Sequence, residues 1–242
     1  MRPMHSWLVL SLLAVPLAAL GADPVTEATA DLDGDGKPEK VTLQPGQDGA
    51  FTLKAGPVSM RGQVTTEAGG NDIHGFTVED IDSSDKRREV LVHTTGELDE
   101  HHRVVFYAYD GKRFTELGKL SSAGEIRGNG IVLVDEWVGF WKRRDKFVLD
   151  AKKAQLRKVE QDVYWVGQEA TVKKSFPLQR SRTDSAVVAN LAPDTKVLVV
   201  AAAPPSAQGP NDWYLIKSST GLMGWARIEY GSELLDGLPW AG

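Results

Sequence analysis

The sequence predicts an all-β fold in two units, and three observations lead to this prediction. Beyond residue 22, almost no stretch shows the 3.6-residue apolar period of a helix. Short runs rich in β-branched and aromatic residues recur instead, and glycine or aspartate turns separate them at the spacing of sandwich, barrel or propeller strands. From Ala170 the composition changes, with a continuous apolar run at 197–203 followed by a loop rich in proline and small residues at 204–212.

Composition and charge indicate an ordinary globular protein. Of the 242 residues, 41% are apolar and 25% are charged, which is too apolar for a disordered chain. The 33 acidic and 28 basic side chains give a net charge of −5, whereas nucleic-acid-binding proteins normally carry a basic excess. The chain has no cysteine, so disulfides, zinc–thiolate sites and a thiol nucleophile are excluded.

Residues 1–22 have the pattern of a secretory signal peptide. Arg2 gives a positive start, residues 8–20 are almost wholly apolar, and Gly21 and Ala22 are small. We expect cleavage after Gly21 or Ala22, which removes one Arg and no acid and changes the net charge from −5 to −6. The alternative is a membrane anchor, but this apolar run is shorter than the about 20 residues of a spanning helix. The sequence therefore predicts a secreted or periplasmic protein without a membrane span in the mature chain.

The N-terminal unit, residues 23–162, is expected to consist of strands joined by tight turns. The expected strands are 41–43, 90–92, 104–109, 131–134 and 146–149. Turns at 34–36, 110–111 and 128–130 supply the glycines that hairpins need for positive φ. Residues 150–159 could form a helix, but a strand runs into this segment, so we expect a hairpin there.

A weak internal repeat links two acidic segments of this unit. Residues 31–41 and 80–90 align at an offset of 49, and each copy begins Asp-apolar-Asp and ends by entering a β run. A period near 50 suits the four-stranded blade of a β-propeller. Residues 23–160 hold fewer than three such periods, so the unit is expected to be propeller-blade-like, either as an open sheet or in a closed form.

The first acidic segment has the residue types of a calcium site. Asp31, Asp33 and Asp35 alternate, Gly36 allows a sharp reversal, and Lys37 can offer its backbone carbonyl before Glu39 returns a carboxylate. These carboxylates repel one another unless a cation lies among them, and oxygen ligands without His or Cys favour Ca²⁺. An EF-hand would need Glu at loop position 12, where this chain has threonine.

Residues 30–39 resemble the Asp-x-Asp-x-Asp-Gly-x-x-Asp/Glu loop of the FG-GAP/VCBS repeats. This resemblance covers about 15 residues and implies a blade of an integrin-type propeller that binds Ca²⁺ through Asp31, Asp33, Asp35 and Glu39, with Lys37 acting through its backbone. The second copy departs from the pattern, because Ser83 and Ser84 replace a glycine and an aspartate and residues 86–88 are basic. Its last two acids, Asp85 and Glu89, fit the pattern only with one inserted residue. We interpret this second copy as vestigial.

Residues 168–230 resemble the bacterial SH3 (SH3b) family. The matching pieces are 191–197, similar to Leu-x-x-Gly-Thr-x-Val, and 213–225, similar to Trp-Tyr-x-Val-x followed by Gly-x-x-Gly-Trp. Asp194 stands where the family usually has glycine. The resemblance implies an SH3-like small barrel, of a kind that binds cell-wall peptides in some proteins and serves as a partner or spacer module in others. The apolar tail at 231–242 is expected to dock back onto a domain.

Three aromatic residues of the second unit are candidate ligand-binding residues: Trp213, Tyr214 and Trp225. The two tryptophans could form a ligand platform, but in this hairpin we expect them to fill the barrel core. Tyr214 alternates with Trp213 along the strand and is then the residue expected to be exposed.

Catalytic signatures are absent from the sequence. It contains no Gly-x-Ser-x-Gly, no His-Glu-x-x-His and no Walker-type loop. A zinc site at 97–102 is disfavoured, because His101 and His102 point to opposite faces if the segment is extended. A hydrolase site near Trp137, Trp141 and Trp165, using Asp135 and Glu136, is the weakest hypothesis, since glycosidase chemistry needs a defined carboxylate separation.

The sequence therefore favours a non-catalytic, Ca²⁺-stabilised binding protein of the bacterial envelope whose ligand is a cell-wall peptide or an envelope protein. The alternatives are an envelope adaptor or assembly protein without affinity for the cell wall, and the hydrolase just described.

Overall fold

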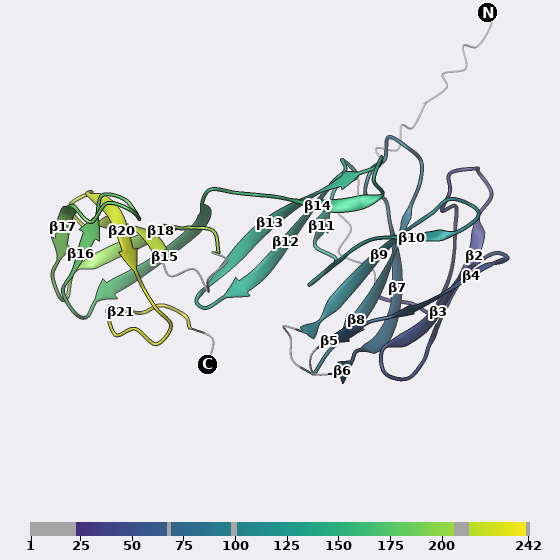
Figure 1. Cartoon of the computed structure of the whole chain (residues 1–242), viewed down its shortest axis with the longest axis horizontal. Coiled ribbons are helices and arrows are strands. Elements are labelled where there is room, and N and C mark those ends of the chain that lie inside the picture. Colours follow the sequence, from purple (N-terminus) through teal and green to yellow (C-terminus); the bar gives the residue numbers. More distant parts are fainter. Residues whose placement is uncertain (1–22, 67–68, 98–100, 206–212, 241–242) are drawn as a thin grey trace, which may run out of the picture.

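The computed structural model describes residues 23–66, 69–97, 101–205 and 213–240, and within these ranges the protein is all-β, without α-helices (Figure 1). This confirms the prediction that the fold is all-β. The predicted signal peptide, residues 1–22, lies outside the described residues, as does most of the predicted loop, 206–212. Within the described ranges, no helix has the length and apolar character that a membrane span requires.

Three consecutive four-stranded antiparallel sheets form the N-terminal part. The first sheet contains β1 (Glu27–Ala30), β2 (Glu39–Pro45), β3 (Ala50–Ala55) and β4 (Val58–Gln63). The second contains β7 (Asp72–Glu79), β8 (Glu89–Thr95), β9 (Arg103–Tyr109) and β10 (Phe114–Leu120). The third contains β11 (Glu125–Ile126), β12 (Ile131–Val138), β13 (Trp141–Asp150) and β14 (Gln155–Val159). A small pair, β5 (Thr65–Thr66) and β6 (Gly69–Gly70), joins the first two sheets, and β13 pairs with β14, which confirms the predicted hairpin.

The second sheet is buried on both faces. One face packs on the first sheet, where Val90, Val92 and Val105 meet the side chains of β2 and β3. The other face packs on the third sheet through Leu91 and Phe106. Because both faces are covered, β8 and β9 read in the sequence as continuous apolar runs rather than as alternating ones.

The two outer sheets bury only one face each. On β3 the residues Thr52 and Lys54 point away from the core, alternating with buried neighbours. On the third sheet an ion pair between Asp135 and Arg144 covers the outer face, with Nε and Nη2 of Arg144 each 2.7 Å from a carboxylate oxygen. Both ends of the three-sheet stack therefore present polar surfaces, and burial does not require a fourth sheet.

The C-terminal part is one seven-stranded antiparallel sheet. Its strands, in spatial order, are β17 (Val187–Leu191), β16 (Phe176–Gln179), β20 (Met223–Arg227), β19 (Trp213–Ser218), β18 (Lys196–Ala202), β15 (Tyr164–Val172) and β21 (Leu235–Asp236). No described pairing joins β17 to β21, so this sheet is curled but open, and the closed small barrel expected from the sequence is not formed. The tail docks as expected, because β21 pairs with β15 and both Leu235 and Leu238 are buried in the core.

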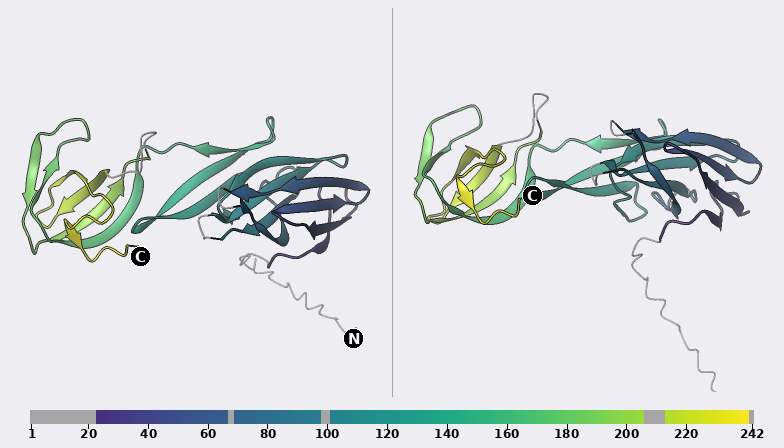
Figure 2. Two further views of the ribbon diagram at one scale, coloured as in Figure 1. Left: turned by 60° about the horizontal axis from the view of Figure 1, so that its bottom comes forward. Right: turned by 90° about the horizontal axis from the view of Figure 1, so that it is seen from below.

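The long β12–β13 hairpin connects the two parts of an elongated molecule (Figures 1 and 2). Its tip inserts Phe140 and Trp141 into the core of the seven-stranded sheet, where the Phe140 ring lies 5.1 Å from that of Tyr214. Gly139 precedes them with φ +70°, and a Cβ there would lie 3.1 Å from the Trp240 ring. The tip of this hairpin therefore packs the N-terminal part against the core of the C-terminal part.

Candidate functional site

The first acidic loop, residues 31–39, connects β1 to β2 and gathers three carboxylates. Asp31, Asp33 and Glu39 each offer an oxygen, and these oxygens lie within 4.8 Å of one another. Two oxygens that bind one Ca²⁺ at about 2.4 Å are at most about 5 Å apart, so the three residues fit such an ion. Gly111, with φ +80°, lies against this group, and a Cβ there would be 2.6 Å from Asp33 Oδ2.

Backbone hydrogen bonds hold these carboxylates in place. Asp31 accepts from the N–H groups of Gly34 at 3.0 Å and Gly36 at 2.9 Å. Glu39 accepts from the Leu32 N–H at 2.9 Å, which folds the end of the loop back onto its beginning.

One of the four predicted carboxylates lies apart from this group. Asp35 accepts from the Lys37 N–H at 2.7 Å, and its other oxygen is 3.9 Å from the Lys37 ammonium. Asp35 is not among the gathered carboxylates, and the Lys37 side chain is exposed. The structure thus brings together three of the four predicted carboxylates.

The second loop, residues 80–89, repeats the backbone geometry of the first. Ile81 N–H donates to Glu89 Oε2 at 3.1 Å, as Leu32 donates to Glu39. Arg87 N–H donates to Asp85 at 2.9 Å, as Lys37 donates to Asp35, so the two copies match with one inserted residue.

The electrostatics of the second loop differ from those of the first. Glu89 is only 3% exposed, and this burial raises its pKa from 4.5 to about 7. Burial also raises the pKa of Asp80, whose Oδ1 is enclosed without a hydrogen-bond partner among the described residues.

A third loop, residues 127–130, follows in the third sheet and carries no carboxylate. The three loops contact one another in sequence order through equivalent backbone bonds. Arg88 N–H donates to Leu32 O at 3.1 Å, and Gly130 N–H donates to Ile81 O at 2.6 Å. The same contact is thus repeated from sheet to sheet, while the side chains of the loops change.

The aromatic residues of β19 and β20 divide between the two faces of the seven-stranded sheet. Trp213, Leu215 and Trp225 lie partly exposed on the outer face, where Leu215 and Trp225 are direct cross-strand partners. Met223 extends this set at one end, and we call these four residues the aromatic strip. The guanidinium of Arg182 lies 5.5 Å from the centre of the Trp225 ring.

Tyr214 takes the opposite face, which corrects the sequence-based expectation. It is 4% exposed and packs in the core against Phe140, so it is not available to a ligand. The two tryptophans, which were expected to fill the core, are on the outer face. The strand places Trp213 and Tyr214 on opposite faces as predicted, but the faces are exchanged because the hairpin tip bearing Phe140 covers the Tyr214 side.

The residues of the hydrolase hypothesis do not converge on a cleft. Trp141 is buried in the core, whereas Trp137 is half exposed with its indole N–H donating to Gly139 O at 2.8 Å. Asp135 and Glu136 are adjacent on β12, and each pairs with an arginine on a different face of the sheet.

The histidines also separate. His101 packs beside Gly96, whereas His102 lines a hollow with His74 and His93. Residues 98–100, which include two acidic members of the proposed zinc cluster, lie outside the described ranges.

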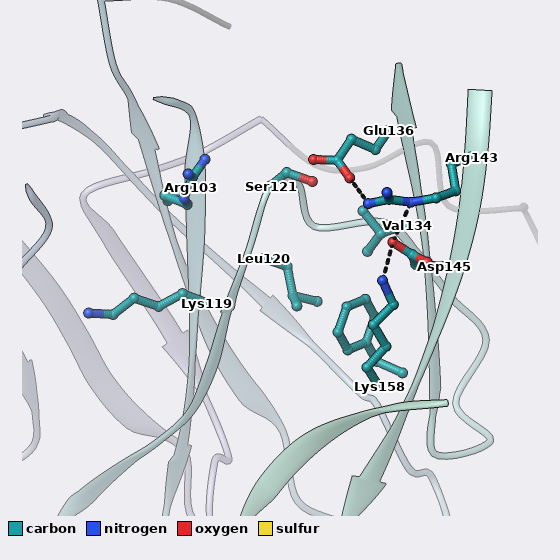
Figure 3. Close-up of a pocket in the computed structure, with 10 residues that line it drawn as sticks. Arg103, Lys119, Leu120, Ser121, Val134, Glu136, Arg143, Asp145 and Lys158 are labelled. Carbon is teal, nitrogen blue, oxygen red and sulfur yellow. Dashed lines mark hydrogen bonds and ion pairs between the residues drawn. The ribbon is translucent and has the colours of Figure 1, made fainter. Parts of the chain in front are cut away.

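A buried ionic group between the two parts was not anticipated from the sequence (Figure 3). Asp145 accepts from Arg143 Nε at 3.0 Å and from the Tyr164 hydroxyl at 3.1 Å, and Lys158 Nζ is 2.9 Å away. Burial, together with the charge of Asp145, raises the pKa of Tyr164 to about 12, so this hydroxyl remains a donor at neutral pH. No sequence signal marked this group, because Asp145 stands among charged residues just before the expected strand 146–149.

Comparison of the chain with profiles of known protein families, with curated proteins and with solved structures gave no match. Functional inference therefore depends on the geometry described above.

Proposed function

We propose that the protein is a secreted or periplasmic, non-catalytic binding protein of the bacterial envelope. In this proposal the three N-terminal sheets are blades of an open propeller fragment that Ca²⁺ stabilises at the first acidic loop. The C-terminal sheet is an SH3b-like module that contacts the ligand, a cell-wall peptide or an envelope protein.

The aromatic strip is the observation that carries the proposal. Aromatic rings on an exposed sheet face offer large contact area at low conformational cost, and they are enriched where proteins bind partners. Lys217 and Arg227 lie on the same face as the strip, as the cross-strand partners of Met223 and Trp213, and Arg182 stacks on Trp225. A surface of this kind suits an extended peptide that carries carboxylates.

Two features support the open-blade arrangement and the cation. The first three sheets are consecutive antiparallel meanders of four strands, with the same loop-to-loop backbone bond between neighbours. The gathered oxygens of Asp31, Asp33 and Glu39 have the spacing that a hard cation needs.

A pull-down of the mature chain, residues 23–242, with purified peptidoglycan tests the proposed ligand. We expect retention of the wild type and loss of most retention in the double variant Trp213→Ala, Trp225→Ala. Trp165→Ala is the matched control, because Trp165 is 69% exposed on another strand of the same sheet. Equal retention of all three proteins would contradict the role of the strip. No retention of the wild type would exclude the cell wall and leave the envelope-protein partner.

A further inference from the structure

We propose that the hollow between the second and third sheets binds the anionic group of a small sugar acid or sugar phosphate. The hollow has a volume of about 230 Å³ and lies at the end of the sheets opposite to the acidic loops. Arg103 and Ser121 line one wall, and Glu136, Arg143 and Lys158 line the other (Figure 3). This site is separate from the aromatic strip and does not depend on the proposed function.

The charge of the hollow is opposite to that of the protein. The chain carries a net charge of −5, yet four basic side chains, those of Arg103, Lys119, Arg143 and Lys158, line this hollow together with two carboxylates. Asp145 is one of the two carboxylates, and its side chain is only 6% exposed. Asp145 is held by Arg143, Lys158 and the Tyr164 hydroxyl. It therefore fixes the positions of the Arg143 and Lys158 side chains at the wall of the hollow.

Glu136 occupies the position where a ligand anion would bind. Arg143 donates through Nε to Asp145 and through Nη2 to Glu136, so its guanidinium is shared between a buried carboxylate and an exposed, exchangeable one. The Glu136 side chain is 45% exposed. Solvent reaches the Glu136 end of this pair, whereas the Arg143 side chain is 16% exposed, so a ligand carboxylate or phosphate can replace Glu136 on Arg143 by exchanging one anion for another. We infer that Glu136 is an internal surrogate for the ligand anion.

The adjoining hollow suits the polar body of such a ligand. It has a volume of about 320 Å³, shares Ser121 with the first hollow and is lined by hydroxyls and imidazoles, including Thr95 and His93. Burial, with the nearby His74, lowers the pKa of His93, so its ring is neutral at pH 7; its Nε2 lies 2.9 Å from Thr77 Oγ1, which leaves one ring nitrogen for a sugar hydroxyl. The two hollows together reach the size range of small-molecule sites, about 300–1,000 Å³.

The third sheet supplies matched controls. Glu136 pairs across the strands with Arg143, and the next pair along, Asp135 with Arg144, has the same charges on the opposite face. A non-specific effect of charge would therefore change the ligand affinity equally whichever pair is mutated. A specific site would respond only to mutation of the first pair.

The test is a titration of the mature chain with glucuronate, glucose 6-phosphate and glucose, followed by NMR at low and high salt. We expect one or both acids to bind and glucose not to bind, with binding weakened by salt. Glu136→Gln should tighten binding by roughly two- to fivefold, because the internal competitor is removed. Arg103→Gln should weaken it by about tenfold, the typical effect of one charged hydrogen bond. Asp135→Asn and Arg144→Gln should leave it unchanged.

The two acids distinguish the chemical source, because preference for glucuronate indicates a carboxylate and preference for glucose 6-phosphate indicates a phosphate. Glucose binding as tightly as the acids would overturn the proposal. The proposal would also be overturned if neither acid bound or if Glu136→Gln bound the acids more weakly than the wild type. It would equally be overturned if Asp135→Asn and Arg144→Gln changed binding as much as the Glu136 and Arg103 variants. A gain in affinity cannot arise from misfolding, so the Glu136 variant remains decisive even if Arg103→Gln is unstable.

Discussion

Replacement of Glu89 by glutamine should stabilise the protein at neutral pH and have little effect in acid. Glu89 is the last residue of the second loop and the first residue of β8, and it is only 3% exposed. Its Oε2 accepts a hydrogen bond from the Ile81 N–H at 3.1 Å. Glutamine has nearly the same shape and keeps a carbonyl oxygen for that bond, but it has no charge to bury. The variant therefore isolates the cost of the buried carboxylate.

The sign and the size follow from the raised pKa. Below pH 4.5 the Glu89 carboxyl is protonated in both the folded and the unfolded chain, so its ionisation takes nothing from the free energy of unfolding there. As the pH rises to about 7, the unfolded chain releases this proton while the folded protein retains it, so the free energy of unfolding falls and then levels off. The interval from 4.5 to about 7, at about 1.36 kcal/mol for each pH unit, gives about 3 kcal/mol.

The assay is urea unfolding of the wild type and Glu89→Gln at pH 4, 6 and 8, with chelator present. The quantity to compare is the difference in the free energy of unfolding between Glu89→Gln and the wild type. The lowered pKa of His93 makes the stability of both proteins rise with pH over an overlapping pH range, and this contribution cancels in the difference. We expect a difference near zero at pH 4 that grows toward about 3 kcal/mol at pH 8. Glu27→Gln, at an exposed pair with Lys40, should show a flat difference. A Glu89 variant no more stable than the wild type at pH 8 would refute the reasoning.

Three further predictions concern the remaining features. With millimolar Ca²⁺ the melting temperature of the wild type should rise by several degrees, because binding at a Ca²⁺ concentration ten times Kd stabilises the folded state by about 1.4 kcal/mol. Asp33→Asn should lose this rise and should be no less stable than the wild type in chelator. Phe140→Ala should reduce the free energy of urea unfolding by about 3–5 kcal/mol, and Trp137→Ala, at the exposed side of the same hairpin, by no more than about 1 kcal/mol. Tyr214→Ala should destabilise by about 3–5 kcal/mol in the same assay and Trp225→Ala by about 1 kcal/mol; the reverse order would restore the sequence-based assignment of the faces.

The local pattern predicted the features that local interactions determine. Strand runs such as 104–109, the hairpin after Leu149 and the matching of residues 31–41 with 80–90 all depend on neighbours in the chain, and the structure has each of them. The one inserted residue in the second copy was visible in the sequence, because its last two acids align only with that insertion.

The features that the sequence did not predict depend on contacts between distant segments. In β19 both faces carry apolar side chains, so alternation separates Trp213 from Tyr214 but does not say which one is inside. That choice is made by Phe140, about 70 residues earlier in the chain, when the hairpin tip covers one face. Asp145 likewise finds its partners on β13, β14 and β15, a combination that no local spacing encodes.

The three loops separate what the fold needs from what a ligand would need. The backbone bond from loop to loop forms with the acidic set of the first loop, with the altered set of the second and with the glycines of the third. Stacking of the sheets therefore does not require three carboxylates gathered within 4.8 Å, and their mutual repulsion opposes folding in the absence of a cation. In the second loop the corresponding glutamate is buried and holds its proton until the pH reaches about 7, which reduces the repulsion by another route below that pH. Among the described residues, the first loop is the one that gathers three partly exposed carboxylates within reach of a single cation, so the first loop is the place to look for the cation.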